Sequence, residues 1–151
     1  MLSSKAKYAL RALVCLAEAH ENESWVLASE IAAAEAIPKK FLEAILVELR
    51  DQGIVKSRRG RYGGYRLARS PSLTSTGAVI RSIDGSLSLT PCASRTNFDQ
   101  CADCVSVQLC PMQLLLRKAR DAVASVLDNC SIAELANQHR SKSSRTRRIA
   151  I

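Results

Sequence analysis

The sequence of residues 37–69 is IPKKFLEAILVELRDQGIVKSRRGRYGGYRLAR. Its first half spaces apolar side chains as one buried face of a helix requires, at Phe41, Leu42, Ile45, Leu46 and Leu49. Pro38 suits the first turn of this helix, where its missing N–H costs nothing, and Gly53 suits the position just past its end. The unburied side of this helix carries Lys39, Lys40, Glu43, Val47 and Arg50.

A shorter helix is predicted at Ser29–Glu35, with Ala36 and Ile37 as the turn between the two helices. Two helices joined by a turn of three to four residues form the helix-turn-helix pattern of DNA-binding proteins. In isolation, the same pattern also fits an ordinary helical hairpin with a solvated face. The residues that follow favour the DNA-binding alternative.

Residues 54–58 and 65–69 both have strand character. The glycines between them permit the positive φ values that a hairpin turn requires, so the segment predicts a wing directly after the helix-turn-helix. Four arginines of the wing can contact phosphates or a minor groove: Arg58, Arg59, Arg61 and Arg66. Gly63 and Gly64 would let the backbone approach the sugar–phosphate chain closely.

Three further helices are predicted around this unit. Apolar residues recur at helical spacing over residues 4–19, a short helix fits residues 76–83, and Ser131 with Glu134 forms a capping box for a short helix after residue 131. Trp25, Val26 and Leu27 can pair as a short strand. The basic residues from 140 to 151, with no acidic residue among them, predict a disordered tail.

The longest predicted helix begins after Pro111. Its apolar residues form a heptad seam with spacings of 4, 3, 4, 3 and 4, at Met112, Leu116, Ala119, Val123, Val126 and Cys130. So wide an apolar stripe requires a partner. We expect both the protein's own first helix and a second protomer to cover it, so the sequence predicts a homodimer through residues 111–130.

The composition restricts the partners and the compartment. The 22 Lys and Arg exceed the 14 Asp and Glu, giving a net charge of +8, which indicates a polyanion and nucleic acid before a membrane surface. No apolar run approaches the roughly 18 residues of a membrane span, and we expect no membrane partner. The first residues predict a cytoplasmic helix and not a signal peptide, because Arg11 interrupts their apolar segment.

Four of the six cysteines lie in residues 92–110, CASRTNFDQCADCVSVQLC, here called the cysteine loop. Thiolates bind Zn²⁺ or iron, and the C-x8-C-x2-C-x5-C spacing lets all four converge on one centre. A structural zinc site and a reversible disulfide between Cys101 and Cys104 are the alternatives. An enzyme is not expected, because the Cys101–Cys104 motif lacks a βαβ context, a nearby His and a nucleotide-binding loop.

The chain resembles the IscR/NsrR/RirA group of bacterial winged-helix regulators, many of which sense iron–sulfur clusters. The matching segments are KYALRALVCLA, the quoted stretch of residues 37–69, VIRSIDG, the cysteine loop and SIAELA. This resemblance implies a homodimeric regulator of transcription, interpreted as a repressor, that binds a double-stranded DNA operator. The residues implied to face DNA are Lys39, Lys40, Glu43, Arg58, Arg59, Arg61, Tyr62 and Gly63.

The resemblance also implies a 2Fe–2S or 4Fe–4S cluster that senses iron, redox or nitric oxide status. The family pattern of three cysteines maps onto Cys92, Cys104 and Cys110, and Gln113 stands where one branch has a fourth ligand, a His. Cys101 is our candidate for the fourth position. The alternative is three cysteines with an open or exogenous site, and the family includes both cluster-loaded and cluster-free DNA binders.

The predicted fold class is mainly α, a winged helix-turn-helix with a small β-hairpin wing and a long C-terminal dimerisation helix. The predicted organisation has five parts. They are a DNA-binding domain at residues 1–70, a linker helix and connection at 71–91, the cysteine loop at 92–110, the dimerisation helix and short C-terminal helix at 111–139, and the basic tail at 140–151.

Overall fold

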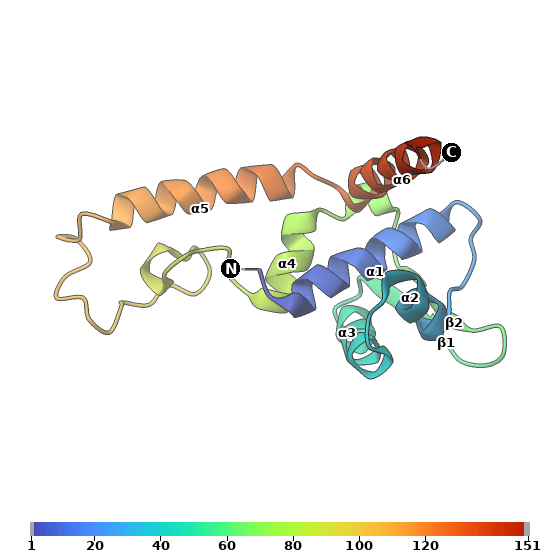
Figure 1. Ribbon diagram of the computed structural model, residues 1–151. Helices are drawn as coiled ribbons and strands as arrows, with labels where there is room; N and C mark the ends of the chain where they lie inside the picture. The colour runs from blue at the N-terminus through green and yellow to red at the C-terminus, as the bar shows by residue number, and fades with distance from the viewer. Residues whose placement is uncertain (1, 150–151) are drawn as a thin grey trace.

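The computed structural model describes the backbone of residues 2–149 and the side chains of residues 2–141. It is mainly helical with one two-stranded sheet (Figure 1). The elements are α1 (Ser4–His20), α2 (Ala28–Glu35), α3 (Lys39–Asp51), β1 (Val55–Arg58), β2 (Gly64–Leu67), η1 (Pro71–Leu73), α4 (Thr76–Asp84), η2 (Pro91–Ala93), α5 (Gln113–Asp128) and α6 (Ile132–Ile149).

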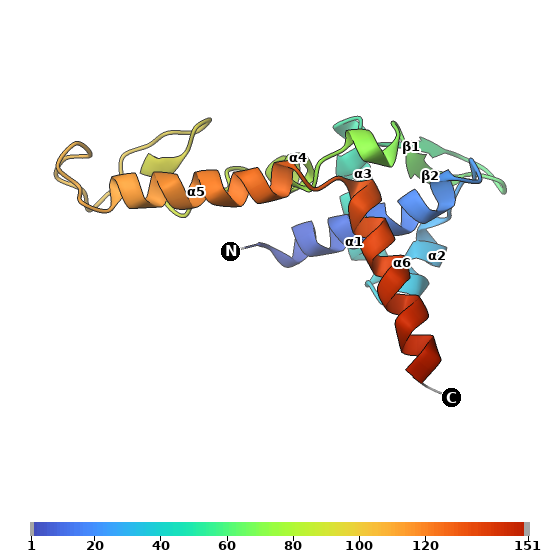
Figure 2. The same ribbon diagram turned by 90° about the horizontal axis from the view of Figure 1, so that it is seen from above.

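Helix α1 lies at the centre of the core. The side chains of Ala9, Ala12 and Leu13 are fully buried, as helical spacing requires of one apolar face. Helices α3, α4 and α6 and strand β2 pack around α1. Figure 2 shows α6 crossing α1, and Ile132 and Ala136 of α6 are buried in the contact.

Helices α2 and α3 form the predicted helix-turn-helix. Ala36 adopts a left-handed conformation between them and Gly53, with φ +71°, follows the end of α3. The predicted stripe of α3 is fully buried at Leu42, Ile45, Leu46 and Leu49. Phe41 was expected in that stripe and is not: it is 41% exposed and meets Tyr8 edge to face, with ring centroids 5.8 Å apart, because it lies at the margin of the apolar face.

Strands β1 and β2 form the predicted antiparallel wing, with Val55 opposite Leu67 and Arg58 opposite Gly64. Val26 adds a bridge at the edge of this sheet, because its N–H and carbonyl pair with Tyr65 at 3.0 and 2.8 Å. The short strand predicted at residues 25–27 is therefore present as a single bridge.

Helices α5 and α6 are joined to the start of α4. The N–H of Thr76 donates to the Cys130 carbonyl at 2.8 Å, and the N–H of Ile132 donates to the Thr74 carbonyl at 2.9 Å. Thr76 Oγ1 donates to the Leu127 carbonyl at 2.7 Å. This junction fixes the point from which α5 and the cysteine loop extend to one side of the molecule (Figure 1).

Two expectations about the C-terminal half require correction. Helix α5 has no buried residue among those described, and α6, not α5, covers α1, because the junction at Thr76 directs α5 away from it. The short helix predicted after Ser131 has its capping box, yet it continues to Ile149, so residues 140–149 are helical and not a disordered tail. The arginines and lysine of this segment favour a helix. Residues 150 and 151 lie outside the described part.

Candidate DNA-binding surface and cysteine site

The exposed side of α3 carries the predicted recognition residues. The side chains of Lys39 and Glu43 are 62% and 47% exposed, one helical turn apart, with Nζ 3.9 Å from Oε1. Lys40 is also exposed. A carboxylate in this position can accept a hydrogen bond from cytosine N4, and the two amines can reach phosphates.

The tip of the wing presents further cationic and aromatic side chains. Arg59, Arg61 and Tyr62 lie in the exposed turn between β1 and β2, and Tyr62 is 78% exposed with the Arg61 guanidinium 5.9 Å from its ring centroid. Arg58, on β1, donates to the Tyr62 carbonyl and so ties the tip to the strand.

Gly63 has a structural reason to be glycine. It is buried, its N–H donates to the Gly60 carbonyl at 3.0 Å, and a Cβ at this position would overlap the carbonyl oxygen of Arg58. Gly64, with φ +131°, likewise lies against the Val26 carbonyl. Both glycines therefore let the wing form; the contact of Gly63 with DNA stays a prediction.

The four cysteines of the cysteine loop line one cavity of about 350 Å³. Cys92 is 3% exposed in η2, and Cys101 Sγ lies 3.6 Å from Cys92 Sγ. The Thr90 hydroxyl, 3.3 Å from Cys92 Sγ, lowers the pKa of that thiol, while the hydrogen bond to Cys92 raises the pKa of Cys101. The structure thus brings the predicted ligand set together around one depression.

The donor set of this cavity fits a thiolate-ligated metal centre in its chemistry. Soft sulfur donors suit iron–sulfur clusters and zinc. The four sulfurs do not have the geometry of a metal site, since within residues 2–141 no group of three or more Cys, His, Asp or Glu is arranged to hold a metal ion. Asp103 and Met112 also line the cavity, and the carboxylate of Asp103 is a possible ligand that no spacing in the sequence marks.

The Cys92 end of the loop is fixed to α5 by a largely buried arginine. Arg120, whose side chain is 11% exposed, donates to the carbonyl of Ala93, next to Cys92, and to Asp121 at 2.7 Å. Asp121 also pairs with Arg95 of the loop at 2.9 Å, and Arg120 is the main cause of its lowered pKa. No sequence motif marked these residues, because the partners are distant along the chain.

The two cysteines outside the loop are half-buried. Cys15 lies on α1, and burial raises the pKa of its thiol. Cys130 lies between α5 and α6, and its carbonyl accepts the Thr76 N–H. Neither residue lines the cavity of the cysteine loop.

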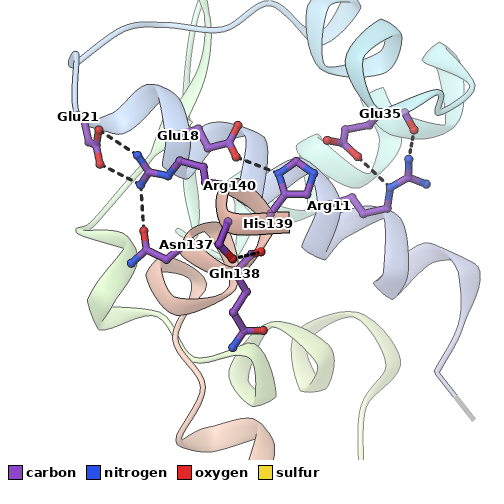
Figure 3. Close-up of polar contacts among 9 residues, drawn as sticks. Arg11, Glu18, Glu21, Glu35, Asn137, Gln138, His139 and Arg140 are labelled. Carbon is purple, nitrogen blue, oxygen red and sulfur yellow. Dashed lines mark hydrogen bonds and ion pairs between the residues drawn. The ribbon is translucent and has the colours of Figure 1, made fainter. Parts of the chain in front are cut away.

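Polar pairs tie α6 to α1 and to the turn after α1, and another ties α1 to α2 (Figure 3). His139 Nδ1 lies 3.0 Å from Glu18 Oε1, and Arg140 pairs with Glu21 at 3.0 Å, which lowers the pKa of Glu21. Arg11 pairs with Glu35 of α2 at 2.9 Å. The His139–Glu18 pair joins residues 121 positions apart, so sequence spacing does not reveal it.

A family model described as Rrf2, iron-dependent transcriptional regulator, matches residues 2–138. The chain belongs to the Rrf2 family. It is 36% identical over 135 residues to the HTH-type transcriptional regulator NsrR of Geobacillus kaustophilus, and the match covers 89% of this chain and 88% of NsrR. This membership confirms the resemblance to the IscR/NsrR/RirA group.

Two solved Rrf2-type structures have the same fold. CymR of B. subtilis, described as its global cysteine regulator, gives a TM-score of 0.73 at 31% identity, covering 91% of this chain and 97% of CymR. IscR of T. potens gives a TM-score of 0.70 at 29% identity, and the match covers 92% of this chain and 88% of IscR. The predicted winged-helix fold class is confirmed.

The Rrf2 relatives are transcriptional regulators, so this chain is a DNA-binding regulator of transcription and not an enzyme. Within the described residues, none of the helices combines the length and the apolar character that crossing a membrane requires.

Proposed function

We propose that this Rrf2 regulator is a homodimeric cytoplasmic repressor whose binding to a double-stranded DNA operator is controlled by an iron–sulfur cluster. The cluster would be held by Cys92, Cys101, Cys104 and Cys110 and would report iron, redox or nitric oxide status. The observation that carries this proposal is that all four thiols line one cavity. The description of the family as iron-dependent supports it.

On the DNA side, α3 would enter the major groove and the wing would follow the adjacent backbone. The exposed cationic side chains and Glu43 supply donors and an acceptor for phosphates and base edges. The proposed contact residues are Lys39, Lys40, Glu43, Arg58, Arg59, Arg61, Tyr62 and Gly63.

The dimer is supported by the unpartnered apolar face of α5. Val123 and Val126 are 46% and 71% exposed, and Leu115 is 66% exposed. Exposed apolar side chains along one long helix are typical of an interface. A second copy packed along residues 111–130 would place two wings on half-sites about one helical turn apart.

When bound, the cluster would supply a redox-active iron centre ligated by thiolates. The chain's own residues fix where such a centre can act. Cys92 lies in η2, which Arg120 holds against α5, and Cys110 lies just ahead of α5. Holding Cys92 and Cys110 together would fix the start of α5, and through the Thr76 junction the placement of the DNA-binding domain.

The test is to purify the protein without oxygen and to measure iron, acid-labile sulfide, zinc and the absorption spectrum. We expect iron and sulfide, with visible absorption, and loss of both in the Cys92→Ser, Cys104→Ser and Cys110→Ser variants. Cys15→Ser and Cys130→Ser are matched controls that should keep the cluster. A colourless protein with stoichiometric zinc would replace the cluster by a structural zinc site.

The fourth ligand is decided by two further variants. Loss of the cluster in Cys101→Ser, with retention in Asp103→Asn, supports the all-cysteine set. The reverse result would assign the fourth position to the carboxylate. An unchanged cluster in both would favour three cysteines with an exogenous ligand.

A second candidate is a metal-free thiol switch, favoured by the 3.6 Å between the sulfurs of Cys92 and Cys101. The sequence suggested Cys101 and Cys104 as the pair; the structure favours Cys92 as the partner. Two thiols and one hydrogen peroxide would give one disulfide and two waters. Peptide mapping of peroxide-treated, metal-free protein should find a Cys92–Cys101 disulfide, and changed DNA affinity without any bound metal would support this function over the first.

A further inference from the structure

The wing has two faces, and only one packs on the core. Val55 and Leu67 are opposite each other and buried. Because side chains alternate along a strand, Lys56 and its partner Arg66 share the other face with Arg58. We call Lys56, Arg58 and Arg66, with Trp25, the outer face of the wing.

Trp25 organises this face. The guanidinium carbons of Arg58 and Arg66 lie 4.9 and 4.6 Å from the centroid of its ring. The backbone next to Trp25 is held to the sheet by the two hydrogen bonds between Val26 and Tyr65. Both arginines therefore stack on an aromatic ring whose position is set by the sheet.

Stacking leaves a guanidinium able to bind an anion. It uses the flat face of the group, while the N–H donors point outward in the plane and match the oxygens of a phosphate. Within the described residues, Arg66 and Lys56 form no ion pair with a carboxylate. The donors of Arg66 are thus available at the surface.

The surroundings add charge of the same sign. Lys56, Arg66 and Arg69 line a cavity of about 340 Å³ together with Ser24 and Ser70. The rest of the lining is His20, Glu21, Glu23, Leu67 and Ala68, and Glu21 is paired with Arg140. Lysine and arginine therefore outnumber the acidic side chains here.

We propose that the outer face of the wing is an additional phosphate-binding surface, on which DNA backbone lies beyond the segment that α3 and the wing tip contact. Trp25 is its positioning residue and acts through Arg58 and Arg66. The surface is continuous with the wing tip through Arg58, which also holds the Tyr62 carbonyl, so one backbone track can reach both. This inference rests on the proposed DNA binding and extends it.

The test uses a fluorescently labelled mixed-sequence duplex, with affinity measured by anisotropy over a series of salt concentrations. The slope of log K against log salt counts neutralised phosphates, at about 0.9 per contact on duplex DNA. We expect Arg66→Gln to reduce the slope by about 0.9 and Trp25→Ala by up to about 1.8. Trp25→Phe should retain the wild-type slope, because a phenyl ring still stacks on guanidinium groups.

Lys118→Gln, which removes one exposed charge from α5, is the matched control and should leave the slope unchanged. Trp25 is the one tryptophan of the chain, so its fluorescence should change when the duplex is added. Arg66→Gln keeps Trp25 and tests the surface even if Trp25→Ala does not fold. If Arg66→Gln and a folded Trp25→Ala both keep the wild-type slope, this inference is overturned and the proposed DNA binding stands. If the wild-type protein does not bind the duplex, both the DNA binding and this inference are overturned.

Discussion

The guanidinium of Arg81 forms a two-point pair with the carboxylate of Asp128, with nitrogen–oxygen distances of 2.7 and 2.8 Å. Arg81 lies on α4, beside the DNA-binding domain, and Asp128 is the last residue of α5. The pair therefore lies where the helix that follows the cysteine loop meets the domain that carries α3 and the wing. Arg120 makes the equivalent connection at the loop itself, through the carbonyl of Ala93.

The Arg81–Asp128 pair should make stability depend on pH in the acid range. Arg81 lowers the pKa of Asp128 from its ordinary value of 3.8, so the pair stabilises the fold fully above that pH. The contribution is lost as the pH falls through the lowered folded-state pKa. Both side chains are over a third exposed, so we expect only about 0.2–1 kcal/mol at neutral pH.

Denaturant unfolding of wild type and Asp128→Asn over a pH series checks this prediction. The stability difference should be constant above about pH 5 and shrink on acidification. In the Arg81→Gln background Asp128 has no partner, so the stability difference between Arg81→Gln and Arg81→Gln/Asp128→Asn should not shrink in this way on acidification. A gap that widens in acid would contradict the assigned role of the pair.

Arg120→Met should loosen η2 from α5. It removes the donor to the Ala93 carbonyl from a site that is only 11% exposed, and we expect the free energy of unfolding to fall by about 1–3 kcal/mol. Cys92, now 3% exposed, should react faster with a maleimide in metal-free protein. Lys118→Met is the control on an exposed neighbouring position, and an unchanged rate at Cys92 in folded Arg120→Met would argue against anchoring.

Charged residues on the apolar face of α5 should separate the protomers. Burial of a valine contributes about 1.5–3 kcal/mol. The Val123→Glu/Val126→Glu protein should therefore weaken dimerisation by roughly 10²–10⁴-fold. Light scattering after size exclusion would measure this, with Arg117→Glu as the polar-face control; a monomeric wild type, or an unaffected dimer, would refute the interface.

Gly63→Ala should destabilise the wing before any DNA is present. A Cβ at residue 63 overlaps the Arg58 carbonyl oxygen, and backbone must move to accept it. We expect a loss of about 1–3 kcal/mol, the usual cost of inserting atoms into a packed site. Tyr62→Ala, which truncates a side chain that is 78% exposed, is the control and should leave thermal stability nearly unchanged while still testing the wing tip.

The helix-turn-helix and the wing could be predicted because their signals are local. The apolar spacing from Leu42 to Leu49 specifies a buried helix face, and Gly63 and Gly64 permit the turn that pairs β1 with β2. The gathering of four cysteines could be predicted from their proximity in sequence. Phe41 was wrongly predicted to be buried, because the burial of a residue at the margin of an apolar stripe depends on what packs against it.

Other features depend on contacts that spacing does not encode. The ion pair between His139 of α6 and Glu18 of α1, the approach of the Cys101 sulfur to that of Cys92, and the stacking of Arg58 and Arg66 on Trp25 all require the folded backbone. The prediction that α1 of the same chain covers α5 was wrong for the same reason. The junction at Thr76, and not the heptad seam, sets the direction of α5.

The sequence by itself determined the helix-turn-helix, where the wing turns and which thiols are available for a metal, because periodicity, glycine and cysteine act over a few residues. The tertiary structure alone decided which of those groups meet. Arg120 lies 27 residues from Ala93 and Arg81 lies 47 from Asp128. Contacts between residues so far apart in the chain form only once it has folded, and they show that the cysteine loop is joined to the DNA-binding domain through α5.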